Sequence, residues 1–179
     1  MNIAALLLAA FAGGALVREM PVIVGTGYRR TTRFESHFSR IVFNPAWTPT
    51  PKIIHLTLAP KFKANPGLLN AMGFDVIDPS SGKLIGGGRS FDWSAYQKAP
   101  FPYVLRQRPG PKNALGQIKF DLPNDFAIYL HDTPDKHLFS ERVRSFSSGC
   151  IRVSDPKWLA SWLLRVQPGE VERLTTTKG

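Results

Sequence analysis

Proline and glycine interrupt this chain so often that few stretches remain in which a long helix fits. The 179 residues include 15 prolines and 15 glycines, and both residue types end helices and favour turns. We therefore expect a mostly β fold with short helices at its edge rather than a helix bundle. The length suits one domain with a real hydrophobic core, so a single domain over residues 1–179 is expected.

The charge balance points to an anionic partner. Lys and Arg number 23 against 13 Asp and Glu, for a formal net charge of +10. Nucleic acid, acidic lipid and an anionic cell-wall polymer all fit this excess of cations. Hydrophobic residues make up 43% and charged residues 20%, which excludes a disordered chain. The single cysteine excludes an internal disulfide and a multi-cysteine metal site, and we expect neither a metal nor another cofactor.

The N-terminal residues admit two interpretations. Residues 2–16 read NIAALLLAAFAGGAL, an apolar stretch that resembles part of a secretory signal. A secretory signal requires a positively charged residue before its apolar stretch, and here no lysine or arginine precedes it. The stretch is also shorter than the roughly 20 residues of a membrane-spanning helix. We favour a β-hairpin, with a strand from Ile3, a turn at Gly13-Gly14 and a return over Ala15–Val24. No convincing export signal and no membrane span are expected.

Short elements separated by turns follow. The patterns predict strands over 39–44, 74–77, 103–108, 117–121 and 126–131, and short helices over 66–72 and 154–165. The last helix is the clearest, because Asp155 is a good N-cap and Pro156 stands at the first position. Its apolar face consists of Trp158, Leu159, Trp162 and Leu163.

The segment from 47 to 102 has a different texture. Prolines stand at 49, 51, 60, 66, 79, 100 and 102, and glycines cluster at 86–88. We expect an irregular insertion or lid here rather than a separate core. Its aromatic residues Trp93, Tyr96 and Phe101 would either cover a cleft or pack beneath the loop, which is the commoner use.

The cysteine lies in a segment suited to nucleophilic chemistry. Cys150 follows a glycine in SSGCIRV, where a sharp turn leaves main-chain N–H groups to bind an oxyanion. His131, 19 positions earlier, ends an apolar run, and strand ends present catalytic side chains. A free thiol has a pKa of about 8.5 and is mostly protonated at neutral pH, so an imidazole nearby is needed to generate the thiolate. Nearby arginines would favour the thiolate further: Arg142, Arg144 and Arg152.

These residues also have structural interpretations. A lone cysteine is most often a small buried residue, and His131 is equally compatible with a core histidine bound to a backbone carbonyl. His137 stands in a polar loop and is expected at the surface. His37 and His55 have no cysteine or carboxylate cluster beside them and are given no role.

The whole string resembles a known signature. His131 is followed by 15 residues and then by Ser-Ser-Gly-Cys-x-Arg over 147–152. This resembles the active-site signature of the YkuD-type L,D-transpeptidases, a histidine, a spacer of about this length and Ser/Thr-His-Gly-Cys. Longer stretches resemble the YcbB-like branch, which carries a lid insertion: PGPKNALGQIKFDLPNDFAIYLHDTP, LFSERVRSFSSGCIRVSDPKWLASWLL and NPGLLNAMGFDVID. The opening residues resemble the family's first hairpin.

The resemblance implies a YkuD-type β-sandwich or barrel-like fold with short peripheral helices and a lid over 47–102. Cys150 would be the nucleophile and His131 its proton acceptor. The main-chain N–H groups around Ser148 and Gly149 would hold the oxyanion. Asp132 would orient the imidazole, either through its backbone carbonyl or through its side chain.

Substrate binding is implied for Ser147 and Arg152, and Arg152 is equally compatible with a structural role in the loop. The donor would be a peptidoglycan tetrapeptide stem, attacked at its third residue with release of D-alanine and formation of a thioester. An amine on a second stem would then give a 3→3 cross-link, whereas water would give L,D-carboxypeptidase activity. The resemblance also implies a periplasmic or cell-wall location, a role in wall biogenesis and cell shape, and acylation by carbapenems.

Two departures keep a catalytically impaired wall-binding paralogue open. Ser148 replaces the family's usual second histidine, and relatives of this branch usually continue beyond the equivalent of residues 175–177, whereas this chain ends at Gly179. A nucleic-acid-binding module would alternate aromatic and basic residues on one strand face, and here the aromatic residues are scattered. A papain-like protease would place its cysteine before its histidine.

Overall fold

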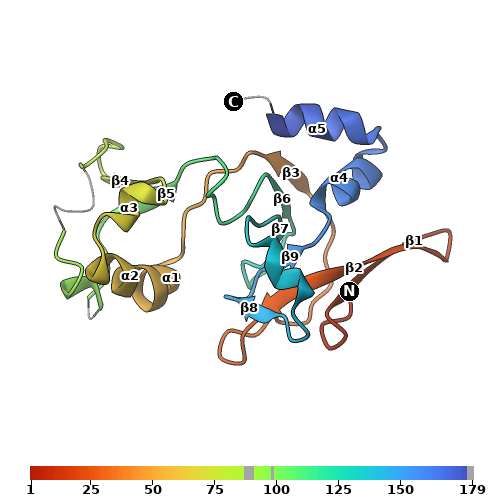
Figure 1. The fold of residues 1–179 in the computed structure, drawn as a ribbon, viewed down its shortest axis with the longest axis horizontal. Coiled ribbons are helices and arrows are strands. Elements are labelled where there is room, and N and C mark those ends of the chain that lie inside the picture. Colours follow the sequence, from red (N-terminus) through yellow and green to blue (C-terminus); the bar gives the residue numbers. More distant parts are fainter. Residues whose placement is uncertain (87–90, 98, 177–179) are drawn as a thin grey trace. The chain divides into compact units, whose positions relative to one another are not determined.

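The computed structural model describes residues 1–86, 91–97 and 99–176, which fall into two compact units. One unit, here called the sheet unit, comprises Met1–Pro45 and Leu115–Gly179, and the other, the inserted unit, comprises Ala46–Ala114. The elements of both units are labelled in Figure 1. Of the residues singled out above, Gly87, Gly88, Thr177 and Gly179 lie outside the described residues.

The sheet unit is built on seven strands. Six form one path in the order β1-β2-β9-β7-β6-β3, and β8 pairs separately with β2. Their bounds are β1 Leu7–Ala12, β2 Ala15–Gly25, β3 Arg40–Phe43, β6 Ile118–Asp121, β7 Leu130–His131, β8 Ser145–Ser147 and β9 Ile151–Val153. The central pair β7–β9 is parallel, whereas its neighbours pair antiparallel. The expected mostly β fold with short helices is confirmed, and within the described residues the sheet stays open rather than closing into a barrel.

The N-terminal hairpin is confirmed. β1 pairs antiparallel with β2, and Ala12 lies opposite Ala15 across the Gly13-Gly14 turn. Both glycines have positive φ, +57° and +83°, as a tight hairpin turn requires. The first strand begins at Leu7 rather than at Ile3, because the chain first folds back and Asn2 pairs with Leu7. No helix among the residues described is long and apolar enough to cross a membrane.

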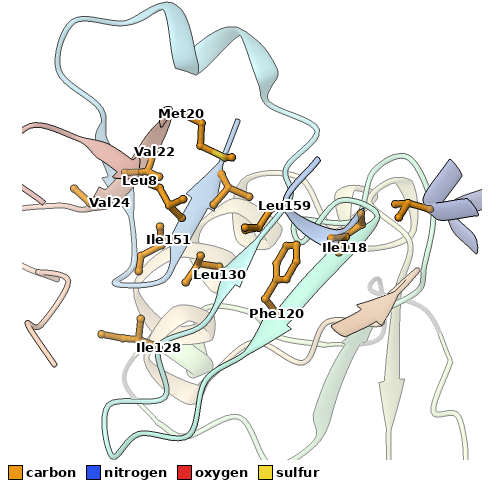
Figure 2. Packing of buried hydrophobic residues seen from close by; sticks show 13 residues of the cluster. Leu8, Met20, Val22, Val24, Ile118, Phe120, Ile128, Leu130, Ile151 and Leu159 are labelled. Atoms are coloured by element: carbon orange, nitrogen blue, oxygen red, sulfur yellow. The ribbon is translucent and has the colours of Figure 1, made fainter. Parts of the chain in front are cut away.

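The hydrophobic core of the sheet unit lies on one face of the sheet. Alternate residues of β1, β2, β6, β7 and β9 are buried there, including Val22, Phe120, Leu130 and Ile151, as Figure 2 shows. Burial of each such large side chain stabilises the fold by about 1.5–3 kcal/mol. Because side chains alternate along a strand, the residues between these positions face away from this core.

Two helices follow the last strand. α4 (Pro156–Leu164) begins as predicted, with the Asp155 carboxylate accepting a hydrogen bond from the Trp158 N–H at 3.0 Å. Its buried Leu159 packs into the core cluster. α5 (Pro168–Thr176) was not among the predicted elements, although Pro168 at its start is a typical first residue of a helix. A 3₁₀ helix also spans Lys136–Ser140.

The strand predicted over 126–131 is wrong for its first four residues, since β7 contains Leu130 and His131 alone. The Asn124 side chain explains the difference. Its Oδ1 accepts hydrogen bonds from the N–H groups of Phe126 and Ile128, at 3.0 and 3.1 Å. Ala127 between them has a φ of +54°, which a strand does not allow. The segment is therefore a tight turn that leads into β7.

The inserted unit has its own hydrophobic cluster, so the expectation that it lacks a separate core is wrong. The cluster consists of Ile54, Leu58, Ala59, Phe62, Leu69, Phe74, Val76, Trp93 and Leu105. Trp93 stacks on Phe101 with centroids 5.2 Å apart, and Phe101 contacts Tyr96 at 4.9 Å. These three aromatic residues thus pack among themselves and against the cluster.

A helical run over residues 51–64 in this unit was missed. It consists of α1 (Pro51–Ile53), a π-helical turn (Ile54–Leu58) and α2 (Ala59–Ala64). Prolines suggested loop, but Pro51 occupies a first position, where no N–H is needed. Pro60 follows the π turn, whose wider spacing relieves the clash with the carbonyl four residues earlier. The unit also contains α3 (Leu68–Ala71), the paired strands β4 (Phe74–Ile77) and β5 (Val104–Gln107), and a 3₁₀ turn (Ala95–Gln97).

Candidate active site

Strands β6, β7 and β9 set His131 between two cations on the sheet face opposite the core cluster. His131 pairs with Lys119 of β6 on one side and with Arg152 of β9 on the other. Leu130 and Ile151, a neighbouring pair, are buried in the core. Because side chains alternate along strands, His131 and its two partners share the other face.

His131 is buried, with 5% of its surface exposed. Its Nδ1 lies 2.5 Å from the Asp132 backbone carbonyl. A carbonyl only accepts hydrogen bonds, so Nδ1 carries the hydrogen and Nε2 is left as the basic nitrogen. Burial, aided by the charge of Arg152, lowers the pKa of His131 to about 3. The imidazole is therefore neutral at physiological pH, with Nε2 unprotonated.

The Asp132 side chain is engaged elsewhere. Its carboxylate accepts hydrogen bonds from the N–H groups of Gln117 and Thr133, at 2.8 and 2.7 Å, and pairs with Lys136. A Cβ atom at Gly116 would lie 2.3 Å from this carboxylate. Asp132 was expected to orient the imidazole through either its backbone carbonyl or its side chain. In the described structure the contact is made by the carbonyl.

Cys150 is half-buried and directly precedes β9. Its sulfur lies 3.7 Å from the carbonyl of Ala127, in the turn before β7. The Ile151 N–H donates to the Tyr129 carbonyl at 3.0 Å, which sets Cys150 beside Tyr129. In the described part of the chain, no hydrogen bond joins the thiol to His131, whose partner in the register of β7 and β9 is Arg152, two residues after Cys150.

Burial raises the pKa of the Cys150 thiol, and this outweighs hydrogen bonds from Tyr129 and the charges of Lys119 and Arg152. The charge of Arg152 favours the thiolate in the expected direction, but burial has the larger effect on the thiol. Arg144, another of the nearby arginines, donates to the backbone carbonyls of Val22 and Leu6. Thiol and imidazole are both neutral at rest.

The buried Ser147 hydroxyl stabilises the Ser147–Cys150 turn through hydrogen bonds within the turn. This hydroxyl donates to the Cys150 carbonyl at 2.5 Å and accepts from the Gly149 N–H at 3.1 Å. Gly149 has a φ of +120°, a conformation that favours glycine. The Gly149 N–H is thus occupied, whereas within the described residues the N–H groups of Ser148 and Cys150 make no hydrogen bond.

The loop after β2 holds this turn from outside. The Thr31 hydroxyl donates to the Gly149 carbonyl at 2.8 Å and accepts from the Gly25 N–H at 2.9 Å. Arg29 donates to the Ser148 hydroxyl at 2.7 Å. A Cβ atom at Gly25 would lie 1.9 Å from the Arg29 carbonyl. In the sequence these residues belong to a polar, basic stretch, GTGYRRTTRF over 25–34, and no spacing links it to Cys150.

Arg152 combines an ion pair with an unsatisfied donor. Its Nη1 lies 3.2 Å from the Asp135 carboxylate, and its side chain is 19% exposed. Its Nε is buried and has no hydrogen-bond partner among the described residues. Buried donors are normally satisfied, so this atom is suited to a ligand or a water molecule.

A groove of about 450 Å³ lies beside Tyr129 and Ala127. Its other lining residues are Ser39, Arg40, Lys119, Asp121, Leu122, Pro123 and Ile128. A second pocket of about 330 Å³ is largely apolar and includes Leu8, Leu130 and Ile151. Neither Cys150 nor His131 is among the lining residues of the groove or of this pocket. Across the described residues, no group of three or more His, Cys, Asp or Glu side chains is arranged to hold a metal ion.

The comparisons with known proteins identify the family. The model of the YkuD family, the L,D-transpeptidase catalytic domain, matches residues 1–171. A protein of Haemophilus influenzae (strain ATCC 51907 / DSM 11121 / KW20 / Rd), whose name proposes an L,D-transpeptidase, is 40% identical over 165 residues. The alignment covers 92% of this chain and 33% of that protein, so the chain spans about a third of the length of this curated relative. With nearly its whole length matched, the chain belongs to the YkuD family of L,D-transpeptidase catalytic domains.

Proposed function

We propose that this chain is a cysteine-dependent L,D-transpeptidase that acts on peptidoglycan stem peptides, with Cys150 as the nucleophile. The observation that carries the proposal is that the single cysteine directly precedes β9, the strand that pairs with β7 and its neutral, oriented His131, in a chain of this family. Cys150 attacks the carbonyl of the third residue of a donor tetrapeptide and releases D-alanine. An amine of an acceptor stem then takes the acyl group and forms the 3→3 cross-link.

The proton path follows from the neutral resting pair. As the sulfur attacks, its proton passes to Nε2 of His131, so that no free thiolate accumulates. The imidazolium then protonates the departing D-alanine amine. In the second half-reaction Nε2 accepts a proton from the acceptor amine. The Asp132 carbonyl bound to Nδ1 supports the imidazolium in each step. Catalytic hydrogen bonds are often longer in ligand-free proteins than in complexes, which fits the absence of one between thiol and ring among the described contacts.

For the oxyanion we propose the N–H groups of Ser148 and Cys150. Support comes from the turn itself, because the Gly149 N–H is bound to the Ser147 hydroxyl whereas the other two make no hydrogen bond in the described structure. Donors that are already oriented stabilise the developing charge without reorganisation. Ser147 and Gly149 then act by holding the turn in shape.

For Arg152 we propose binding of a stem-peptide carboxylate. The unsatisfied Nε supports this role, since guanidinium groups bind carboxylates through paired hydrogen bonds. The ion pair with Asp135 supports the alternative, structural role. Action as a lid by residues 47–102 is a proposal that rests on the family resemblance alone, as are the periplasmic or cell-wall location, a role in cell shape and the reaction with carbapenems.

Product analysis tests the function. Purified disaccharide-tetrapeptide is incubated with the protein, and the products are separated and weighed by mass spectrometry. Cross-linked dimers that have lost one D-alanine are expected. Tripeptides would indicate L,D-carboxypeptidase activity instead, and unchanged substrate would indicate the catalytically impaired paralogue.

Matched variants tie the products to the site. Cys150→Ala and His131→Gln are both expected to abolish product formation. His137→Gln, a change at a histidine expected to be exposed, is expected to leave it unchanged, and no hydrogen bond of its ring is present in the described structure. Equal activity of Cys150→Ala and the unmodified protein would contradict the proposal.

A further inference from the structure

We infer that the Tyr129 hydroxyl is a further catalytic group, which donates a hydrogen bond to the Cys150 sulfur during attack, and that Lys119 holds the phenol ring in position. The inference rests on the proposed role of Cys150 as nucleophile. In the sequence, Tyr129 falls within the strand predicted over 126–131. In the structure Tyr129 directly precedes β7 and follows the turn that the Asn124 side chain stabilises.

The backbone brings Tyr129 to the sulfur. Its carbonyl accepts the N–H of Ile151, the residue after Cys150, at 3.0 Å. Tyr129 and Cys150 are thus neighbours across the parallel pair β7–β9. Hydrogen bonds from the backbone and side chain of Tyr129 lower the pKa of the Cys150 thiol, against the burial that raises it.

The ring of Tyr129 contacts both a cation and the proposed base. Lys119 Nζ lies 4.5 Å from the centre of the phenol ring, a favourable cation–π geometry. The centre of the His131 ring lies 5.6 Å from it, with the two ring planes inclined by 57°. Both neighbours belong to the paired strands β6 and β7, so the position of the ring is set by the sheet rather than by a loop.

Lys119 is itself fixed. Its ammonium pairs with Asp121 at 2.6 Å, and the second oxygen of this carboxylate pairs with Arg40 at 2.7 Å. A lysine side chain has four rotatable bonds, and one ion pair together with one ring contact removes much of that freedom. Lys119 is therefore a positioning residue that acts on the nucleophile through the phenol ring and through its charge.

The groove of about 450 Å³ exposes part of this arrangement to a ligand. Tyr129 and Lys119 line it, as does Ala127, whose carbonyl contacts the Cys150 sulfur. A stem peptide in the groove would therefore lie along the phenol ring on its way to the nucleophile.

The chemistry requires a donor at this place. When the thiol gives its proton to His131, negative charge develops on a half-buried sulfur, and hydrogen bonds to charged groups are stronger than those to neutral ones. The hydroxyl keeps its own proton throughout, and the bond that forms is still that between sulfur and the substrate carbonyl carbon. A tyrosine that only filled space would need its ring and not its hydroxyl. Removal of that one oxygen separates the two roles.

Tyr129→Phe and the pH dependence of Cys150 alkylation by iodoacetamide form the test. Intact mass gives the rate, and substrate turnover is not required. The charged or titratable groups close to the sulfur, beside Tyr129 itself, are His131 of β7, Lys119 of β6, Arg152 of β9 and Arg29 at the adjoining Ser148. All of these remain in Tyr129→Phe.

We expect Tyr129→Phe to move the midpoint of the alkylation profile to higher pH and to slow alkylation at pH 7.5 about tenfold, the loss of one charge-assisted hydrogen bond. The rate on the high-pH plateau is expected to stay unchanged. Lys119→Met is expected to raise the midpoint as well, and Lys119→Arg to restore it in part. The matched control is Tyr28→Phe, which alters a 99% exposed tyrosine and is expected to leave the profile unchanged.

The same profile for Tyr129→Phe and the unmodified protein would overturn the inference. Should Tyr129→Phe not fold, 3,5-difluorotyrosine at position 129 keeps the shape and makes the hydroxyl a stronger donor. It is expected to lower the midpoint, and an unchanged midpoint would equally overturn the inference. If Cys150 of the unmodified protein is alkylated only after unfolding, the proposed function fails, and the inference fails with it.

Discussion

A buried histidine held neutral makes the stability of the fold depend on pH. In the unfolded chain His131 titrates near its ordinary pKa of 6.5, whereas burial lowers its pKa to about 3 in the fold. Between these values the unfolded state binds one more proton, so stability falls as the pH drops through this window and is unaffected above it. The slope is at most about 1.4 kcal/mol per pH unit.

The comparison of the unmodified protein with His131→Gln isolates this residue. Urea unfolding gives the free energy of unfolding of each protein at pH 7.5 and at pH 4.5. Between these two values the unmodified protein is expected to lose more of it than His131→Gln does, by on the order of 2 kcal/mol. The titration of the carboxylates changes the free energy of unfolding equally in both proteins, so it cancels in the comparison. Identical losses in the two would show that His131 titrates normally in the fold.

Single residues also show what the sequence could and could not reveal about the site. Cys150 and His131 stood out because a nucleophile and a base in this order carry a recognisable spacing. Thr31 and Gly116 did not, because their roles depend on contacts with Gly149 and Asp132 that arise only when distant segments pack together. A hydroxyl in a polar loop and a glycine before a strand carry no such spacing.

At the scale of elements, the loop after β2 sets the shape of the nucleophile turn. Thr31→Val keeps the volume of the side chain and removes both hydrogen bonds of its hydroxyl. The turn then loses its contact at Gly149, so the rate of D-alanine release is expected to fall at least tenfold, since small misplacement of reacting groups is costly. The matched control is Thr175→Val, which removes another buried hydroxyl, one bound to Glu172 in α5. Equal rates for the two variants would contradict this role of the loop.

The start of α4 offers a separate test of local structure. Asp155→Ala removes the N-cap of this helix and is expected to lower the free energy of unfolding by about 1 kcal/mol. The ion pair with Arg18 is half exposed and contributes little. Asp155→Asn keeps a capping oxygen, so its free energy of unfolding, measured with urea, is expected to fall clearly less than that of Asp155→Ala. If both variants lose the same amount, the cap is not the source of the stability.

Elements with strong local signals were predictable, and those shaped by one side chain were not. The Gly13-Gly14 turn and the Asp155-Pro156 start appear in the sequence as they do in the fold. The turn before β7 depends on Asn124 bonding to backbone groups up to four residues ahead, which shortened the strand expected there. In the run over 51–64, prolines at tolerated positions concealed a helix.

At the scale of the whole chain, the two hydrophobic clusters are separate. Phe62 is fully buried in the inserted unit, so Phe62→Ala is expected to remove about 3–5 kcal/mol of stability there. Hydrogen exchange is expected to show faster exchange across residues 46–114, with little change in β6 and β9. Phe120→Ala, in the core of the sheet unit, is expected to show the reverse pattern. Equal loss of protection in both units after either change would show a single cooperative core.

The central claim is that the Cys150 sulfur takes the acyl group of the donor. The most direct measurement is the mass of the intact protein after brief exposure to disaccharide-tetrapeptide and an acid quench, followed by mapping of the modified peptide. We predict an adduct with the mass of the donor less D-alanine, located on Cys150, removed by hydroxylamine and absent from Cys150→Ala. An adduct that persists in Cys150→Ala, or cross-linking by that variant, would contradict the account.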